Sequence, residues 1–293
     1  EDVTNTVYLP DGTMSITGRT GNHSLRIAAN DTTLYNSSGT VHISSTGTTY
    51  IEAQGKSGAD RYLWNLIASS SDDGTVNSTK SGGITILNDF TIDKGSFYSR
   101  QGGAIKDLTV NHIVYINSGT LIAHESDDAA AATCTFGALY IGANGTYDAT
   151  SGTTSLTNSY YGDHYAFSNK AGGTFTHNSG TVSFDMQTSY QNVGNNGQWF
   201  YNLISTNRES SYHVGLQQSD QYLNVANNFT IASGAFTDNS GYTVTVSGTV
   251  YCSGSWGTTI NVASPFARQK NKKFLGGLII GPYGTFTAPN DTA

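Results

Sequence analysis

Short alternating segments dominate the pattern of apolar and polar positions along the chain. Roughly four to six residues alternate between the two classes and are followed by Gly, Asn, Asp or Ser, as in "ITILNDFTID" (84–93) and "LYIGANGTYDA" (139–149). An alternation with a period of two places Phe90 and Ile92 on the same face of a strand. The Gly and Asn residues between segments accept positive φ and therefore predict turns. The pattern predicts an all-β protein made of short strands.

The chain also repeats itself at an offset of about 139 residues, which is the signature of a repeat architecture. "GALYIGANGTYDA" (137–149) matches "GGLIIGPYGTFTA" (276–288). Four further pairs occur in the same order: "SGTVHIS" with "SGTVSFD", "YLWNLIAS" with "WFYNLIST", "ITILNDFTIDKGSF" with "YLNVANNFTIASGAF", and "DLTV" with "TVTV". Ordered matches at a nearly constant offset are not expected from composition alone. They predict two copies of one unit.

Strand–turn units that recur about every 15 to 22 residues predict a parallel β-solenoid, in which the apolar side chains of each coil stack on those of the next. We expect residues 1–37 to be the tail of a preceding unit or an N-terminal cap, residues 38–178 to be the first unit, and residues 179–293 to be the second, truncated unit. The alternative is a pair of tandem β-sandwich domains, which requires a linker near residues 151–175. That stretch carries several large apolar and aromatic side chains, which favours the solenoid.

Two segments resemble a known class of repeat. "AGGTFTHNSGTVSFD" (171–185) and "FYNLIST" (200–206) are similar to units of the Gly/Thr/Asn-rich β-solenoid repeat proteins of bacterial surfaces and phage fibres, which read GTFTHNSGTV, FYNLI and NFTI. The resemblance covers most of the chain. It implies an exported or virion-borne structural fibre, and it implies no chemical reaction.

Composition and charge restrict the classes of partner. Charged residues make up 12% of the chain, and the net charge is −7. A negative chain of this kind disfavours nucleic acid as a partner, because phosphate binding needs a positive face. No window approaches the roughly 18 apolar residues that a membrane span requires, so we predict no membrane insertion. Cys134 and Cys252 lie outside any CxxC spacing, which leaves one disulfide and two buried free thiols as equal alternatives.

The densest acidic cluster is "HESDD" (124–128). Its carboxylates, Glu125, Asp127 and Asp128, suggest Ca²⁺ binding or paired carboxylates for glycoside cleavage. The ligand spacing of an EF-hand is absent, so a solvated loop is the favoured interpretation. We therefore predict no cofactor, with Ca²⁺ as an unsupported alternative.

The corresponding loop of the second copy, "SPFARQKNKK" (264–273), is basic. If the copies stack along one rod, the two loops are expected on one side of it, about 33 Å apart at one strand spacing per coil. Opposite charges at such positions would set the register between neighbouring subunits. The predicted subunit-contact residues are Glu125, Asp127, Asp128, Arg268, Lys270, Lys272 and Lys273. Two unrelated surface loops are the alternative interpretation.

Aromatic residues gather in "SYYGDHYAF" (159–167). Exposed tyrosines stack well on sugar rings, which makes Tyr160, Tyr161 and Tyr165 candidates for carbohydrate binding. Packing along a strand ladder is the alternative role for such tyrosines. The chain contains no GxSxG, HExxH, P-loop or CxxC motif, so we predict no catalytic residue, no metal site and no enzyme.

Together these features predict a non-enzymatic structural rod segment of an extracellular or virion fibre or adhesin. We expect it to act at a cell surface or on a virion and to form a homo-oligomer or polymer. One alternative is a carbohydrate-binding or glycan-degrading tailspike-like β-helix, with surface glycans as partners. The other is a self-assembling extracellular filament subunit, because an uncovered solenoid end exposes strand edges.

Overall fold

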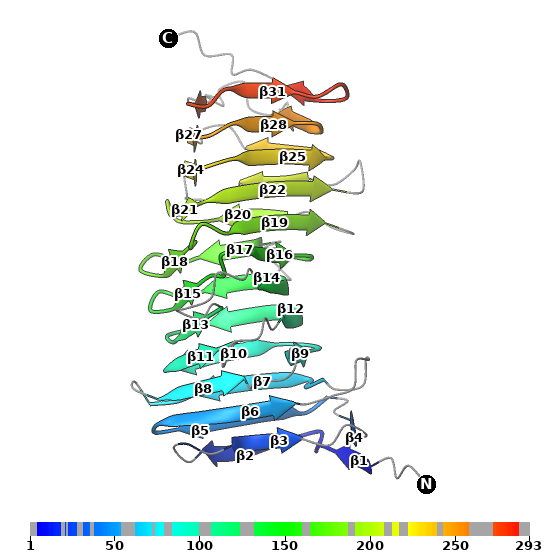
Figure 1. Cartoon of the computed structure of the whole chain (residues 1–293), viewed down its shortest axis with the longest axis vertical. Helices are drawn as coiled ribbons and strands as arrows, with labels where there is room; N and C mark the ends of the chain where they lie inside the picture. Colours follow the sequence, from blue (N-terminus) through cyan, green and yellow to red (C-terminus); the bar gives the residue numbers. More distant parts are fainter. Residues whose placement is uncertain are drawn as a thin grey trace, which may run out of the picture.

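The computed structural model is a column of stacked β-coils with the N- and C-terminal ends at opposite ends of the column (Figure 1). It describes residues 5–18, 21, 23–27, 32–35, 38–53, 62–71, 74–78, 84–99, 107–123, 132–159, 165–186, 191–207, 213–216, 222–238, 243–257 and 272–286. Within these ranges there are strands, turns and bends but no helix. The all-β prediction is confirmed.

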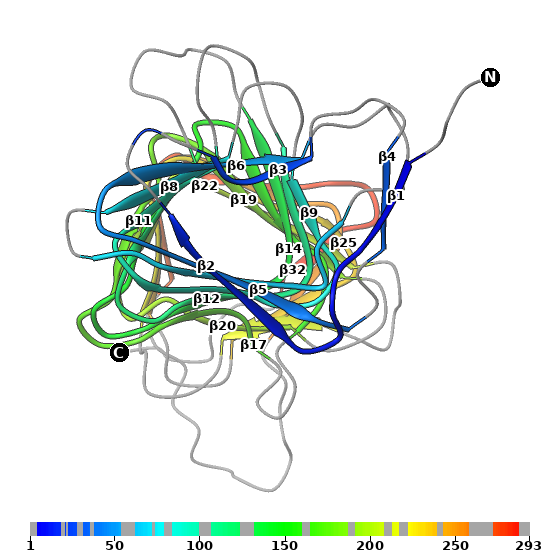
Figure 2. The same ribbon diagram turned by 90° about the horizontal axis from the view of Figure 1, so that it is seen from below.

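Each coil visits three faces of a closed tube, which Figure 2 shows from the N-terminal end. The first face consists of β2 (Thr13–Gly18), β5 (Thr40–Ser45), β7 (Asn65–Ser69), β10 (Phe90–Lys94), the second halves of β12 (Leu108–Ile116) and β14 (Thr133–Ile141), β17 (Tyr165–Asn169), β20 (Gln191–Gly194), β23 (His213–Leu216), β26 (Ala235–Asp238), β29 (Ser255–Gly257) and β32 (Thr285–Phe286). β12 and β14 each begin on the third face, which is described below, and bend onto the first face. The first and third faces therefore share one sheet.

The second face follows the first along the chain. It contains β3 (His23–Ile27), β6 (Thr48–Ala53), β8 (Thr75–Ser78), β11 (Ser96–Tyr98), β13 (Thr120–Ile122), β15 (Thr146–Asp148) and β18 (Thr174–Thr176), and then β21 (Trp199–Phe200), β24 (Tyr222–Val225), β27 (Thr243–Val246) and β30 (Lys272–Phe274). In Figure 1 most of the labelled strands of this face line one side of the column.

The third face closes the tube. It contains β9 (Ile84–Ile86), the first halves of β12 and β14, β16 (Thr153–Leu156), β19 (Thr181–Met186), β22 (Asn202–Asn207), β25 (Phe229–Ser233), β28 (Val250–Cys252) and β31 (Leu278–Ile280). A separate two-stranded sheet, β1 (Asn5–Tyr8) with β4 (Thr32–Tyr35), lies beside the first coils.

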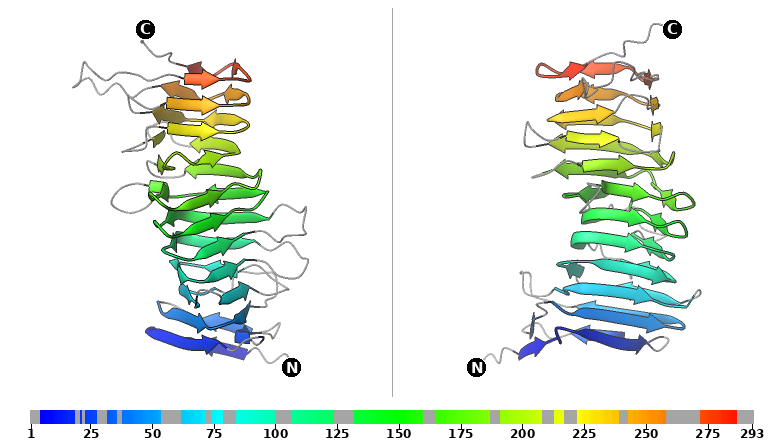
Figure 3. Two further views of the ribbon diagram at one scale, coloured as in Figure 1. Left: turned by 90° about the vertical axis from the view of Figure 1, so that its left-hand side faces the viewer. Right: turned by 180° about the vertical axis from the view of Figure 1, so that it is seen from behind.

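Every pairing between the described strands is parallel, and on the first and third faces each strand inside the column pairs with strands of the coils before and after it. On the second face the parallel strands form two separate sheets, one ending at β18 and the other starting at β21. Antiparallel sandwich domains cannot give this pattern, so the parallel β-solenoid is the fold and the tandem-sandwich alternative is excluded. The stretch that a sandwich would use as a linker contains β16, β17 and β18, with Leu156 and Phe167 fully buried. The coils stack evenly along the whole column (Figure 3).

The coils are longer than the sequence pattern suggests. Residues that are hydrogen-bonded between adjacent coils in the N-terminal half lie 22 to 28 positions apart, from Leu63–Thr85 to Gly47–Thr75, with Asn65–Asn88 and Asp107–Thr133 in between. The sequence pattern predicts only about 15 to 22 residues for each strand–turn unit. The difference arises because each coil needs three faces and three corners, and the corners add residues that the strand pattern does not show.

The sequence-matched segments occupy equivalent ladders. On the first face successive neighbours are Val41, Leu66, Phe90, Val114 and Leu139. On the third face the successive neighbours are Val182, Leu203, Phe229, Val250 and Leu278. Even the aromatic contacts agree: the ring centroids of Phe90 and Phe97 are 4.6 Å apart at 70°, and those of Phe229 and Phe236 are 4.8 Å apart at 77°.

The strands from β5 to β15 form the first matched set, and those from β19 to β32 form the second set. The second set is therefore turned by one face of the tube relative to the first set. The sheet of the first and third faces continues across the predicted boundaries at 37/38 and 178/179, since Met14 pairs with Val41 and Thr154 pairs with Val182, whereas the second face divides into two sheets between β18 and β21. These boundaries stay predictions about the repeat unit and do not delimit separate bodies.

Candidate functional site

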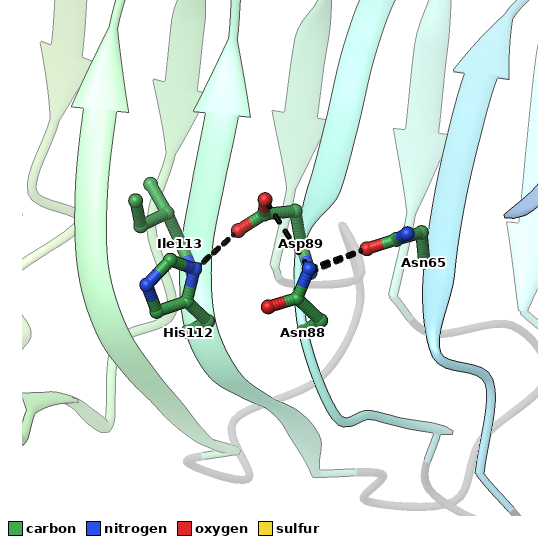
Figure 4. Close-up of polar contacts among 5 residues, drawn as sticks. All are labelled: Asn65, Asn88, Asp89, His112 and Ile113. Atoms are coloured by element: carbon green, nitrogen blue, oxygen red, sulfur yellow. Dashed lines mark hydrogen bonds and ion pairs between the residues drawn. The ribbon is translucent and has the colours of Figure 1, made fainter. Parts of the chain in front are cut away.

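A line of hydrogen-bonded polar side chains lies at the corner between the third and first faces, on three adjacent coils (Figure 4). Asn65 is at the start of β7, and its Oδ1 accepts hydrogen bonds from Asn88 Nδ2 at 2.8 Å and from the backbone N–H of Asp89 at 3.1 Å. Asn65 Nδ2 in turn donates to Thr40 Oγ1 at 3.3 Å. The polar groups freed at this bend are thus satisfied by side chains of the neighbouring coils.

Asp89 continues the same line to the next coil. Its Oδ1 accepts the backbone N–H of Ile113 at 3.2 Å and lies 2.7 Å from His112 Nδ1. The two side chains are partly exposed, 41% for His112 and 30% for Asp89. In the part of the chain that the structure describes, no serine, threonine or cysteine side chain is hydrogen-bonded to His112. Within those ranges the His112–Asp89 pair is not joined to a third side chain as in a Ser–His–Asp triad.

The equivalent corner in the second set of strands lies between the second and third faces and has different chemistry. Asn202 Oδ1 accepts from Asn227 Nδ2 at 2.9 Å and from the backbone N–H of Asn228 at 3.3 Å. Asn228 Oδ1 accepts the backbone N–H of Thr249 at 3.0 Å. Asn228 thus takes the place of Asp89, and Gly248 stands where His112 stands in the first set. What the two corners share is the hydrogen bonding between adjacent coils at the bend.

A second candidate is a hollow of about 210 Å³ on the outer side of the first face. It is lined by Ile113, Ala138, Leu139, Tyr140, Tyr165, Ser168 and Lys170. Lys170 Nζ lies 5.6 Å from the centre of the Tyr140 ring. The centres of the Tyr140 ring and of the Tyr115 ring on the preceding coil are 5.9 Å apart. The hollow is smaller than the roughly 300 Å³ at which small-molecule pockets usually begin.

The predicted tyrosines do not come together as a described cluster. Tyr165 lies on β17 and exposes only 7% of its surface, which leaves little of its ring for stacking on a sugar. Tyr160 and Tyr161 fall outside the described residues. Sequence reasoning missed Tyr115, Tyr140 and Lys170, because only the pairing of β12, β14 and β17 brings these three positions together.

Most of the predicted subunit-contact residues also fall outside the described ranges. These are Glu125, Asp127, Asp128, Arg268 and Lys270. Lys272 and Lys273 lie on β30, and Lys273 is exposed.

The acidic and basic loops themselves lie outside the described residues, so their placement on one side of the rod stays a prediction, but the strands that flank them lie at different corners of the tube. The acidic segment is flanked by β13 and β14, at the corner from the second to the third face. The basic segment is flanked by β29 and β30, at the corner from the first to the second face. The rotation of the second set by one face causes this difference.

The buried ionisable groups belong to the core. The Tyr147 hydroxyl and Thr154 Oγ1 are 2.7 Å apart and buried, and burial raises the pKa of Tyr147 well above its usual value, with Cys134 acting in the same direction. Cys134 and Cys252 are both buried, and no disulfide joins them. Within the described ranges there is no cluster of three or more His, Cys, Asp or Glu side chains arranged to hold a metal ion.

The described part of the chain contains no helix that is long and apolar enough to cross a membrane. Comparison with protein-family models, with curated proteins and with solved structures gave no match to this chain.

Proposed function

We propose that the chain is a non-enzymatic structural rod segment of an extracellular or virion fibre or adhesin, and that it self-associates. The observation that carries this proposal is the continuity of the column. Parallel pairing on the first face runs from β2 to β32, and one buried cluster extends from Val41 to Cys252. A column held by cross-coil hydrogen bonds and an unbroken core keeps its shape along its length, as a fibre segment must.

The corner hydrogen bonds support the same proposal. Asn65 and Asp89 each accept hydrogen bonds from the adjacent coil, so their polar atoms are engaged in holding coils together. The equivalent corner at Asn202 and Asn228 does the same without an ionisable side chain. A role in cohesion explains both corners, whereas a role in catalysis would apply to one of them.

Immunogold electron microscopy of the source cells or particles tests this function. Antibody raised against the 293-residue chain is expected to label external fibres, and pre-immune serum is the control. Label confined to the cell interior, or absent from every fibre, would contradict the proposed function.

Carbohydrate binding is the second candidate, and the hollow beside Tyr140 and Lys170 is the observation that favours it. A glycan array and an assay for released reducing sugar would detect binding or cleavage. In that case Tyr140→Ala should remove the signal, while Tyr251→Ala, at an exposed tyrosine of β28, should leave it unchanged. No signal with the unaltered chain on both assays rejects this candidate.

A further inference from the structure

The last described coil ends in apolar surface. Leu275 is 61% exposed, Ile279 52%, Ile280 50% and Tyr283 89%. The residues that are packed against the core but remain partly exposed gather at the two ends of the column: Leu9, Met14, Ile16 and Leu25 at the N-terminal end, and Phe274, Leu278 and Phe286 at the C-terminal end. Within the described residues, core-facing side chains are therefore only partly covered in the first and last coils.

The same coil is completely covered where it occurs in the middle of the column. Ile141, which matches Ile280, is fully buried, and Leu139, which matches Leu278, is 1% exposed. The local geometry is otherwise conserved. The rings of Phe136 and Tyr147 are 6.1 Å apart at 63°, and those of Phe274 and Phe286 are 5.9 Å apart at 69°. The two coils thus differ mainly in what lies above them.

In the middle of the column the covering coil is formed by β16, β17 and β18. Its contacts have a defined register: Phe136 pairs with Leu156, Leu139 with Phe167, Tyr140 with Ser168, and Tyr147 with Phe175. This junction shows which coil fits on the coil made by β14 and β15.

The N-terminal coil of the chain is a copy of that covering coil. In sequence, "DGTMSIT" (11–17) matches "SGTTSLT" (151–157). In structure, Met14 pairs with Val41 as Thr154 pairs with Val182.

The irregularities of the two coils agree as well. The pairing of β3 with β6 shifts between His23 and Leu25, and the pairing of β17 with β20 shifts between Tyr165 and Phe167. A matched shift of register is a specific feature, because it displaces one residue of an otherwise regular ladder. Leu25 is therefore the counterpart of Phe167.

We propose that the C-terminal end of the column is the docking surface for the N-terminal coil of a second copy of this chain, stacked head to tail. The register is that of the internal junction: Phe274 beside Ile16, Leu278 beside Leu25, and Ile279 beside Arg26. The proposal rests on the proposed function as a structural rod and specifies its partner. Contact between unlike ends does not close on itself, so the product is an open filament.

The docking requires one local exchange. β1 pairs with β4 through Val7 and Leu34, as β15 pairs with β18 through Tyr147 and Phe175. In the stacked arrangement, β1 of the incoming copy and β32 of the first copy would therefore compete for the same position beside β4 of the incoming copy. Stacking replaces β1 by β32 as the neighbour of β4, so removal of residues 1–8 should strengthen association.

Two neighbouring residues of β31 provide a matched test by sedimentation velocity over a range of concentrations. Ile279 and Ile280 are equally exposed, but Ile280 corresponds to the buried Ile141 whereas Ile279 corresponds to the outward Tyr140. The unaltered chain is expected to form species of multiple chain mass. Ile280→Lys would bury a charge at the junction and should weaken association at least about 10-fold, while Ile279→Lys should change it little. A chain that stays monomeric, or equal effects of the two variants, would overturn the proposal.

Disulfide trapping tests the register even where a variant alters stability. The pair Ile279→Cys and Arg26→Cys would face each other between adjacent strands, within the Cα separation that a disulfide accepts. Oxidation should give covalent chains of copies, and a pair made of Ile279→Cys and Thr17→Cys should not. Equal trapping by both pairs would contradict this register. If the purified chain forms only single rods without end-to-end contact, this inference is wrong. If antibody against the same chain still labels external fibres, the proposed rod function remains in place.

Discussion

The two sets of matched strands differ on their outer side and agree on their inner side. Inside, the aromatic pairs Phe90–Phe97 and Phe229–Phe236 have nearly the same separation and angle. Outside, Asp89 and His112 of the first set are replaced by Asn228 and Gly248. The comparison shows that the core and the bends are what both sets need, because a misfit there disturbs every neighbouring coil, whereas the outer chemistry is open to change.

The largest effect is expected from truncating the matched core aromatics. Phe90→Ala and Phe229→Ala each remove a side chain with no exposed surface, and each should lower the free energy of unfolding by about 3–5 kcal/mol. Urea unfolding followed by circular dichroism measures both. Losses that differ by more than about 2 kcal/mol would break the equivalence of the two sets.

The matched turn glycines come next. Gly95 and Gly234 have φ of +69° and +68°, a region that costs an L-residue about 1–2 kcal/mol. At Gly95 an added Cβ would also lie 2.6 Å from the carbonyl oxygen of Gly74. Gly95→Ala should therefore cost about 2–4 kcal/mol in thermal or urea unfolding. Gly12→Ala is the control, because its Cβ would meet nothing within 4 Å. Equal effects of these two substitutions would argue against the tight turn.

A smaller loss is expected at the corner asparagines. Asn65→Ala and Asn202→Ala each leave a backbone N–H at the bend without its acceptor, at a cost of about 1–3 kcal/mol. Asp89→Asn, which copies the second corner into the first, should cost less than about 1 kcal/mol. If Asp89→Asn proves as damaging as Asn65→Ala, the carboxylate has a role that the second corner lacks.

The smallest effect concerns pH. Burial lowers the pKa of His177 from its ordinary value near 6.5, and its Nδ1 accepts the backbone N–H of Ser179 at 3.0 Å. The unfolded chain then binds more protons than the folded chain in a window just below pH 6.5, so stability should fall as the pH drops through that window. His177→Asn, which installs the residue found at the matched position Asn36, should flatten this dependence in melting curves between pH 5 and 8. An unchanged slope would show that other groups control it.

The fold could be inferred from sequence largely because the inward positions alternate so regularly. Periodicity places Phe90 and Ile92 on one face of a strand, and both side chains are fully buried in the core. The candidate sites could be inferred much less well. Asn65 and Asp89 are 24 residues apart in the sequence, and Asp89 and His112 are 23 apart, so the three residues form no local sequence motif. Of the tyrosines in the aromatic segment 159–167, Tyr160 and Tyr161 lie outside the described residues, and Tyr165 is buried.

The sequence by itself determined the strand class, the inward-facing residues, the turns and the spacing at which the pattern recurs, because these depend on neighbours within a few residues. Only the tertiary structure decided how many residues make a coil, that the tube has three faces, and that the second set of strands is turned by one face. Those properties depend on which residues meet after a complete coil. That choice is made by the packing of the core and the hydrogen bonds at the corners, such as Asn65 to Asp89, and local propensity does not encode it.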